Sequence, residues 1–271
     1  MSSQAVSSGE LDEVIDDAKL FRNYEQAASA YYKEHGGLDD EAYWEQMTKK
    51  SGEVNTLSPS DQIIQGAQFY RTFREGVLMM GKMSKCGQCP DDHITIASAF
   101  VISEDGVCVT NYHVFKQRDP SVVEDYITLF VMDINQNIYP VVEVLAASKS
   151  NDLVMFRVDV QGEKLKPLSI GHDQLIGEPI NLISHPDHKF YTYTQGHVTR
   201  KYFRPGTSSV RQSISAEFAH GSSGAPILDS CGNVVGVVAA TQNVYYLPNN
   251  QGYQMTLKEI IPVSCLKELI N

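Results

Sequence analysis

The hydrophobic residues of the chain follow one period in its first part and another in the rest. Before about residue 93 they recur every three or four positions, which predicts amphipathic helices. A first helix carries the apolar positions Leu11, Ile15, Ala18, Phe21 and Tyr24. A second stretch, 39–47, follows the breaker pair Gly36 and Gly37.

A third helix is marked by its end signals. Ser58 suits an N-cap, Pro59 suits the first helical position, and Asp61 lies three residues after the cap. Its apolar face would contain Ile63, Ile64, Ala67, Tyr70, Phe73 and Val77. We expect all these apolar stripes to be packing surfaces rather than cofactor or partner sites.

From Ile94 onward the pattern changes to short segments rich in β-branched and aromatic residues. Ten strands are predicted, at 94–102, 107–111, 126–132, 139–144, 153–158, 179–183, 191–199, 210–218, 225–228 and 234–240. Many short strands separated by turn residues indicate an all-β barrel or sandwich. The last stretch, 256–270, is predicted to be a helix with Leu257, Ile260, Ile261 and Leu266 on its apolar face.

Composition narrows the classes of function. The 271 residues can build one sizeable core or two modest ones, and a net charge of -11 argues against a nucleic-acid partner. No apolar run approaches the roughly 20 residues of a transmembrane helix, so no such segment is expected. The Ser-rich start is also what remains after removal of an export or lipoprotein signal, and we favour a periplasmic or exported location over a cytoplasmic one.

The five cysteines include one closely spaced pair, Cys86 and Cys89, with His93 nearby. We expect a local disulfide or plain loop thiols here first, a zinc site second and a redox centre last. Structural zinc needs four ligands, and no second Cys/His pair lies close in sequence. A redox Cys-x-x-Cys would be expected at a strand-to-helix turn, whereas this pair precedes a run of β pattern. No metal or cofactor is therefore expected.

The segment from His220 to Pro226 carries the strongest chemical signal. A serine between glycines can project its hydroxyl from a tight turn while backbone N–H groups point to the same place. The amides of Gly221 and Ser223 would then form an oxyanion hole. Taken alone, Gly-Ser-Ser-Gly is equally typical of a flexible loop.

Two further residues favour a catalytic turn over a flexible loop at 220–226. His113 ends a buried strand that begins at Val107, and Asp152 begins the apolar segment Leu153 to Phe156. Each has an ordinary structural interpretation by itself: a histidine satisfied by backbone hydrogen bonds, and a strand-end aspartate that binds its own turn.

Together the three segments resemble the trypsin-like serine peptidases, and among them the bacterial Deg or high-temperature-requirement branch. The chain has Thr110-Asn111-Tyr112-His113-Val114, then Asp152-Leu153-Val154, then Gly221-Ser222-Ser223-Gly224-Ala225-Pro226. The family has Thr-Asn-x-His-Val, Asp-Leu-Ala and Gly-Asn-Ser-Gly-Gly-Pro in the same order. Ser222 thus replaces Asn and Ala225 replaces a glycine. The pair His185-Pro186 is a weaker similarity.

The resemblance covers residues 94–270 and implies a fold, a domain division and a reaction. The fold would be mainly β, with two six-stranded antiparallel β-barrels, a helical N-terminal extension and a C-terminal helix. The extension would occupy 1–93, which lies outside the resemblance, and the protease domain 94–271. As a departure from the family pattern, no PDZ module is expected. The protein would be a serine endopeptidase acting on a protein or peptide substrate, with His113, Asp152 and Ser223 as its triad. The sequence does not define its oligomeric state.

The pocket for the side chain before the cleaved bond should be built from 216–220 and from 238–241. We expect Ala216, Glu217, His220, Ala239, Ala240 and Thr241 to contact the substrate. The small residues at 239–241 favour a small or medium apolar side chain, whereas Glu217 would favour a basic one if it pointed inward. Two alternatives to an active enzyme are a silent binding module and a form inhibited by its helical region.

Overall fold

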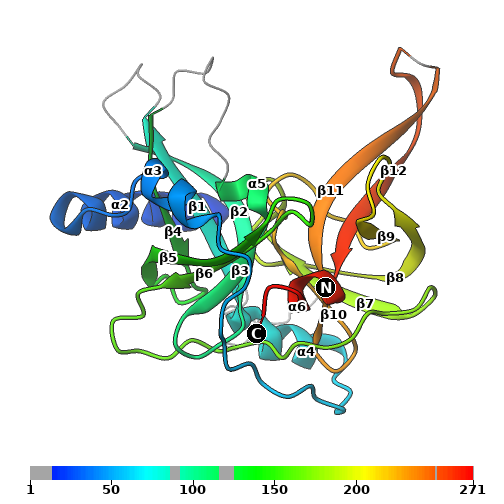
Figure 1. Ribbon diagram of the computed structural model, residues 1–271, viewed down its shortest axis with the longest axis horizontal. Helices are drawn as coiled ribbons and strands as arrows, with labels where there is room; N and C mark the ends of the chain where they lie inside the picture. The colour runs from blue at the N-terminus through cyan, green and yellow to red at the C-terminus, as the bar shows by residue number, and fades with distance from the viewer. Residues whose placement is uncertain (1–13, 86–91, 116–124, 248, 271) are drawn as a thin grey trace, which may run out of the picture.

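The structure is a computed structural model that describes residues 14–85, 92–115, 125–247 and 249–270. Within them, twelve strands form two antiparallel sets of six (Figure 1). The first set pairs in the order β1-β2-β3-β6-β5-β4, and β4 pairs back with β1 to close a barrel. Its members are β1 (Val77–Lys85), β2 (Asp92–Val101), β3 (Val107–Thr110), β4 (Asp125–Met132), β5 (Ile138–Ser148) and β6 (Leu153–Val158).

The second set pairs in the order β10-β11-β12-β9-β8-β7, and β7 pairs back with β10 to close a ring. Its members are β7 (Pro179–Ser184), β8 (Thr192–Phe203), β9 (Val210–Ile214), β10 (Pro226–Leu228), β11 (Val234–Leu247) and β12 (Gln251–Pro262). Figure 1 shows the long hairpin of β11 and β12, in orange and red, extending away from the rest of this set. The prediction of a mainly β chain is confirmed.

Both faces of β1 are buried, because one face lines the inside of the barrel and the other packs against residues outside it. In β1, Leu78 and Met80 belong to one apolar cluster, while Val77 and Met79 belong to another. The second cluster also takes in residues of the other strand set, such as Ile261, and of the helices. Alternate side chains of a strand point to opposite faces, so this core lies between the two sets and joins them.

Two helices lie against the first barrel (Figure 1). These are α2 (Asp17–His35) and α3 (Asp40–Gln46). From α2, the buried Tyr24 hydroxyl lies 2.8 Å from the Phe130 carbonyl oxygen and 3.2 Å from that of Met79. From α3, the Tyr43 hydroxyl donates to the Val141 carbonyl over 2.9 Å. No helix in the described part of the chain is both long and apolar enough to span a membrane.

The helix expected from Ser58 begins only at Gly66. It comprises α4 (Gly66–Phe73) and the 3₁₀ turn η1 (Arg74–Gly76). The preceding residues use their backbone groups in tertiary pairing: Ser60 N–H donates to the Asn233 side chain over 2.7 Å, and Ile64 N–H donates to the Ser230 carbonyl over 3.0 Å. These bonds replace the ones that a helix would make within itself.

The residue expected to end that helix, Val77, instead begins β1, a strand that the sequence did not predict. β1 pairs with β2 and β4, so the barrel starts ahead of the boundary expected at residue 94. The helix expected over 256–270 is likewise wrong in most of its length. Its first half is part of β12, which lies between β11 and β9 in the second ring, and only α6 (Val263–Lys267) is helical.

Candidate active site

His113 lies on a single helical turn, α5 (Tyr112–Phe115), directly after β3. Two hydrogen bonds hold this turn in place. The Asn111 side-chain amide and the Tyr112 N–H both donate to the carbonyl oxygen of Asp152, over 3.0 and 3.1 Å. Val114 and Phe115 are buried, whereas 45% of the His113 side chain is exposed. The imidazole is therefore held at the surface by a fixed backbone.

Asp152 lies at the turn between β5 and β6 and points its carboxylate at His113. One carboxylate oxygen accepts the His113 backbone N–H over 3.0 Å, and the other lies 2.9 Å from His113 Nδ1. An ionised carboxylate can only accept, so in a neutral imidazole Nδ1 would carry the proton and Nε2 would keep a free lone pair. The backbone of Asp152 has a φ of 59°, a left-handed conformation that Asp tolerates better than most residues.

Ser223 lies on the turn between β9 and β10, which packs tightly on the first barrel. Its carbonyl accepts the N–H of Ser98 in β2 over 2.9 Å, and the Ser98 hydroxyl donates to the Gly221 carbonyl over 2.9 Å. Thr110, at the end of β3, donates to the Ser98 carbonyl over 2.7 Å. Since His113 follows Thr110 by three residues, these bonds bring the serine turn to the same end of the barrel as His113 and Asp152.

Both glycines of this turn are required by close approach. Gly221 and Gly224 have φ angles of +91° and +86°. A Cβ on Gly221 would overlap the His185 carbonyl oxygen, and one on Gly224 would overlap Thr110 Oγ1 and the Ser98 carbonyl oxygen. Only a residue without a side chain fits at either position.

The two adjacent serines differ in their surroundings. Ser222 is fully buried, and its hydroxyl lies 3.0 Å from that of Ser184. Ser223 is partly exposed. Among the described residues, no hydrogen bond links the Ser223 hydroxyl to His113, and the N–H groups of Gly221 and Ser223 have no acceptor. The turn thus leaves one serine hydroxyl and two amides available to a bound molecule.

The six expected substrate contacts have different degrees of exposure. Ala216 and Ala239 are buried, whereas Glu217, His220, Ala240 and Thr241 are exposed. The side chain of Glu217 is 79% exposed and its carboxylate lies 3.0 Å from Lys258 Nζ. Lys258 is a residue of this region that we did not predict. Lys258 lies in the segment that was predicted to be a helix, so its position beside Glu217 could not be predicted from the sequence.

The loop 185–191 also contacts the serine turn. Its Asp187 N–H donates to the His220 carbonyl over 2.7 Å. Full burial lowers the pKa of His185 from 6.5 to about 3, so the ring is neutral, and its Nδ1 accepts the Tyr191 N–H over 3.1 Å. On its other side the loop meets α2, where the Asp17 carboxylate accepts the Phe190 N–H over 2.9 Å. Only the His185-Pro186 pair marked this loop in the sequence.

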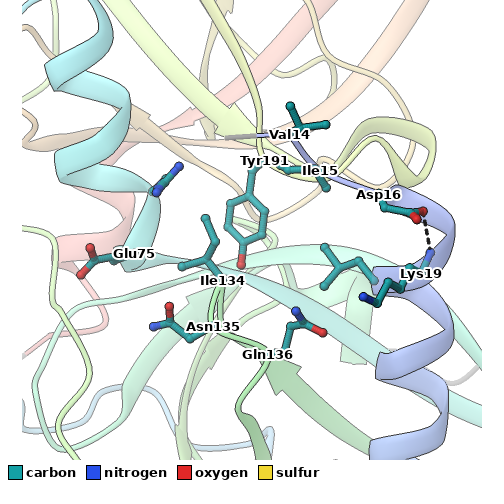
Figure 2. A pocket seen from close by; sticks show the side chains of 11 residues that line it. Val14, Ile15, Asp16, Lys19, Glu75, Ile134, Asn135, Gln136 and Tyr191 are labelled. Atoms are coloured by element: carbon teal, nitrogen blue, oxygen red, sulfur yellow. Dashed lines mark hydrogen bonds between the residues drawn. The ribbon is translucent and has the colours of Figure 1, made fainter. Parts of the chain in front are cut away.

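A pocket of about 360 Å³ lies between the start of α2, η1 and the turn after β4 (Figure 2). Figure 2 shows the ring of Tyr191 reaching into it, between Ile134 and Ile15. His113, Asp152 and Ser223 are absent from its lining, so the pocket is separate from the candidate active site. The pair Cys86 and Cys89 lies outside the described residues.

Comparison with known proteins identifies the family. Residues 97–237 match the model of the trypsin-like peptidase domain. Protease Do-like 1, chloroplastic, of Arabidopsis thaliana is 28% identical over 53% of this chain and 32% of its own length. A probable periplasmic serine endoprotease DegP-like of Brucella suis is 26% identical over 70% of this chain and 35% of its own. The chain thus spans about a third of the length of these two relatives.

Two solved structures have the same fold. An HtrA-type protease with a tripeptide matches with a TM-score of 0.59 and 17% identity over 76% of this chain and 62% of its own. Deg5 matches with a TM-score of 0.55 and 20% identity over 73% of this chain and 88% of its own. These two likenesses show the fold, and the curated relatives are similar to the chain as proteases of the Deg/HtrA type. The matched domain covers about half of the chain and shows that the chain belongs to the trypsin-like peptidase family.

Proposed function

We propose that the protein is a serine endopeptidase in which His113, Asp152 and Ser223 form the catalytic triad. The observation that carries this proposal is the pair of hydrogen bonds that the Asp152 carboxylate accepts from His113, over 3.0 Å from the backbone N–H and over 2.9 Å from Nδ1. They orient the imidazole and leave Nε2 free to accept a proton. That is the role a general base needs beside a serine nucleophile.

The reaction would proceed through an acyl-enzyme. The Ser223 hydroxyl attacks the carbonyl carbon of the peptide bond while His113 Nε2 takes its proton, and Asp152 stabilises the positive charge on the imidazole. The amides of Gly221 and Ser223 donate to the oxyanion, a contribution of roughly 2.7 to 4 kcal/mol per donor in other enzymes. His113 then gives the proton to the leaving amine. A water molecule, deprotonated by the same nitrogen, attacks the acyl carbon. The bond to Ser223 Oγ then breaks, and His113 returns the proton to that oxygen as the acid product leaves.

We further propose that the two strand sets are the two barrels of a trypsin-like domain that begins at Val77 rather than at Ile94. The pairing of β1 with β2 and β4 supports this boundary. Residues ahead of it would form the helical extension. An exported location is supported by the similar proteins, which include periplasmic and chloroplastic proteases. Peptides or proteins would be the substrates.

The test compares Ser223→Ala with Ser222→Ala, which removes the neighbouring hydroxyl. Cleavage of casein and of fluorogenic peptides is measured, and a fluorophosphonate is used to label the nucleophile. We expect Ser223→Ala to abolish both cleavage and labelling with an unchanged melting temperature, while Ser222→Ala still takes the label. A wild-type protein that neither cleaves nor takes the label, or a label on another residue, would refute the proposal.

A further inference from the structure

Lys258 is a lysine in an unusual position, because it is almost completely buried beside the serine turn. The residue is 8% exposed, although lysine is among the residues least often buried. Its Nζ donates to the carbonyl oxygen of Phe218 and lies 5.2 Å from the centre of the Phe218 ring. Phe218 precedes Ser223 by five residues. The ammonium group is thus fixed between an aromatic ring and the backbone that leads to the proposed nucleophile.

The register of the strands places Lys258 across the expected substrate pocket. Its Cα pairs with Thr241 in β11, which belongs to one wall of that pocket. Its side chain reaches Phe218, which belongs to the other wall, 216–220. The neighbouring Glu259 points to the opposite face of the strand, where its carboxylate accepts the Tyr202 hydroxyl over 2.6 Å and lies 3.5 Å from Arg211 Nε. Lys258 therefore spans the space where the substrate side chain would enter.

The ammonium group retains capacity for another acceptor. It has three N–H donors, and in the described part of the chain two acceptors contact it, the Phe218 carbonyl and the Glu217 carboxylate. Glu217 is 79% exposed, whereas only 10% of the Lys258 side chain is exposed. A carboxylate that is mostly in water loses little when it moves aside. A buried ammonium that loses its partner needs a new one.

We propose that Lys258 makes this pocket select an acidic side chain, Glu or Asp, immediately before the cleaved bond. The proposal rests on the proposed function for the position of the pocket relative to Ser223. A substrate carboxylate would accept the third N–H of Lys258 or replace Glu217, forming a charge-assisted hydrogen bond. A basic side chain would meet the like charge of a buried ammonium. An apolar one would leave that charge without a new partner.

This selectivity differs from both expectations drawn from the sequence. Ala239 and Ala240 suggested an apolar preference, and Glu217 suggested a basic one if it pointed inward. The exposure of Glu217 and its contact with Lys258 remove the basis for the second expectation. The expected apolar preference did not take Lys258 into account, and this lysine places a positive charge in the pocket.

The first experiment measures binding, so that it does not depend on turnover. Acetylated tetrapeptides ending in Glu, Gln, Lys or Val are titrated into the Ser223→Ala protein, and their dissociation constants are measured by calorimetry. Gln is the matched neutral control for Glu. We expect Glu to bind at least about tenfold more tightly than Gln, as a charge-assisted hydrogen bond allows, and Lys to bind most weakly. Equal binding of Glu and Gln would overturn the proposal.

The second experiment assigns the effect to Lys258. In the Ser223→Ala background, Lys258→Met should bring the Glu and Gln peptides to equal affinity, while Lys201→Met, which removes an exposed lysine, should leave their ratio unchanged. Glu217→Gln removes the competing carboxylate and should raise the ratio. This variant tests the proposal even if Lys258→Met fails to fold. A ratio that survives Lys258→Met, or that does not rise in Glu217→Gln, contradicts it.

The same peptides, extended past the cleaved bond, separate the two proposals in the wild-type protein. If both peptides are cleaved with nearly equal kcat/KM, the proposed selectivity for acidic side chains is refuted, but the proposed triad is not. Tight binding of the Glu peptide without any cleavage or fluorophosphonate labelling would refute the proposed function but not the selectivity of the pocket for an acidic side chain.

Discussion

Replacing Gly224 by alanine should destabilise the protein more than the same replacement at another left-handed glycine. At a φ of +86°, an alanine costs roughly 1 to 2 kcal/mol in conformational strain. The new Cβ would also overlap Thr110 Oγ1 and the Ser98 carbonyl oxygen, and would lie 3.0 Å from the Thr110 Cα. Overpacking of this kind adds about 1 to 3 kcal/mol. The expected loss is therefore about 2 to 5 kcal/mol.

Gly177 provides the matched control. Its φ is +92°, but a Cβ there would meet nothing within 4 Å. Gly177→Ala should cost only the strain, about 1 to 2 kcal/mol. Urea unfolding of the two variants and of the wild type gives both values. In addition, Gly224→Ala should lower the rate of labelling of Ser223 by a fluorophosphonate, because the overlap displaces the serine turn, whereas Gly177→Ala should not.

The refuting result is equal destabilisation by the two substitutions. It would mean that the turn can move away from Ser98 and Thr110 at no cost, so that the contacts of Gly224 do not hold Ser223 in place. The hydrogen bonds from Ser98 to the Ser223 and Gly221 carbonyls would then not define the geometry of the site.

Two further predictions concern the helices and the buried histidine. Tyr24→Phe should cost about 1 to 3 kcal/mol, because it removes a buried hydroxyl that lies within hydrogen-bonding distance of two strand carbonyls, while Tyr32→Phe in the same helix should cost under about 0.5 kcal/mol. Urea unfolding checks this, and similar losses would show that α2 is not anchored through Tyr24. The pKa of His185 is about 3 in the folded protein and 6.5 in the unfolded chain. Between pH 6.5 and pH 3 only the unfolded state binds this proton, so the free energy of unfolding should fall as the pH is lowered through this range. Unfolding at pH 7, 5.5 and 4 should show a smaller loss for His185→Gln, and parallel curves would contradict the assignment.

The sequence alone was sufficient for the family, and it supplied the three residues that we propose as the triad. The strands 107–111 and 153–158 were predicted within a residue or two, because a buried strand bounded by turn residues has a local signature. The motifs around His113, Asp152 and Ser223 are local as well, since a serine turn that approaches another backbone needs glycine at fixed positions. Gly221 and Gly224 meet that need.

The strands β1 and β12 were decided by the tertiary structure. β1 is apolar on both faces, so its pattern lacks the alternation of a strand, and helix and strand cannot be told apart over so short an apolar run. β12 is a strand because β9 and β11 offer it hydrogen-bonding partners, and only this pairing sets Lys258 opposite Thr241 and within reach of Phe218 and Glu217. A buried charge and its partners come from segments far apart in sequence. No local pattern therefore records them.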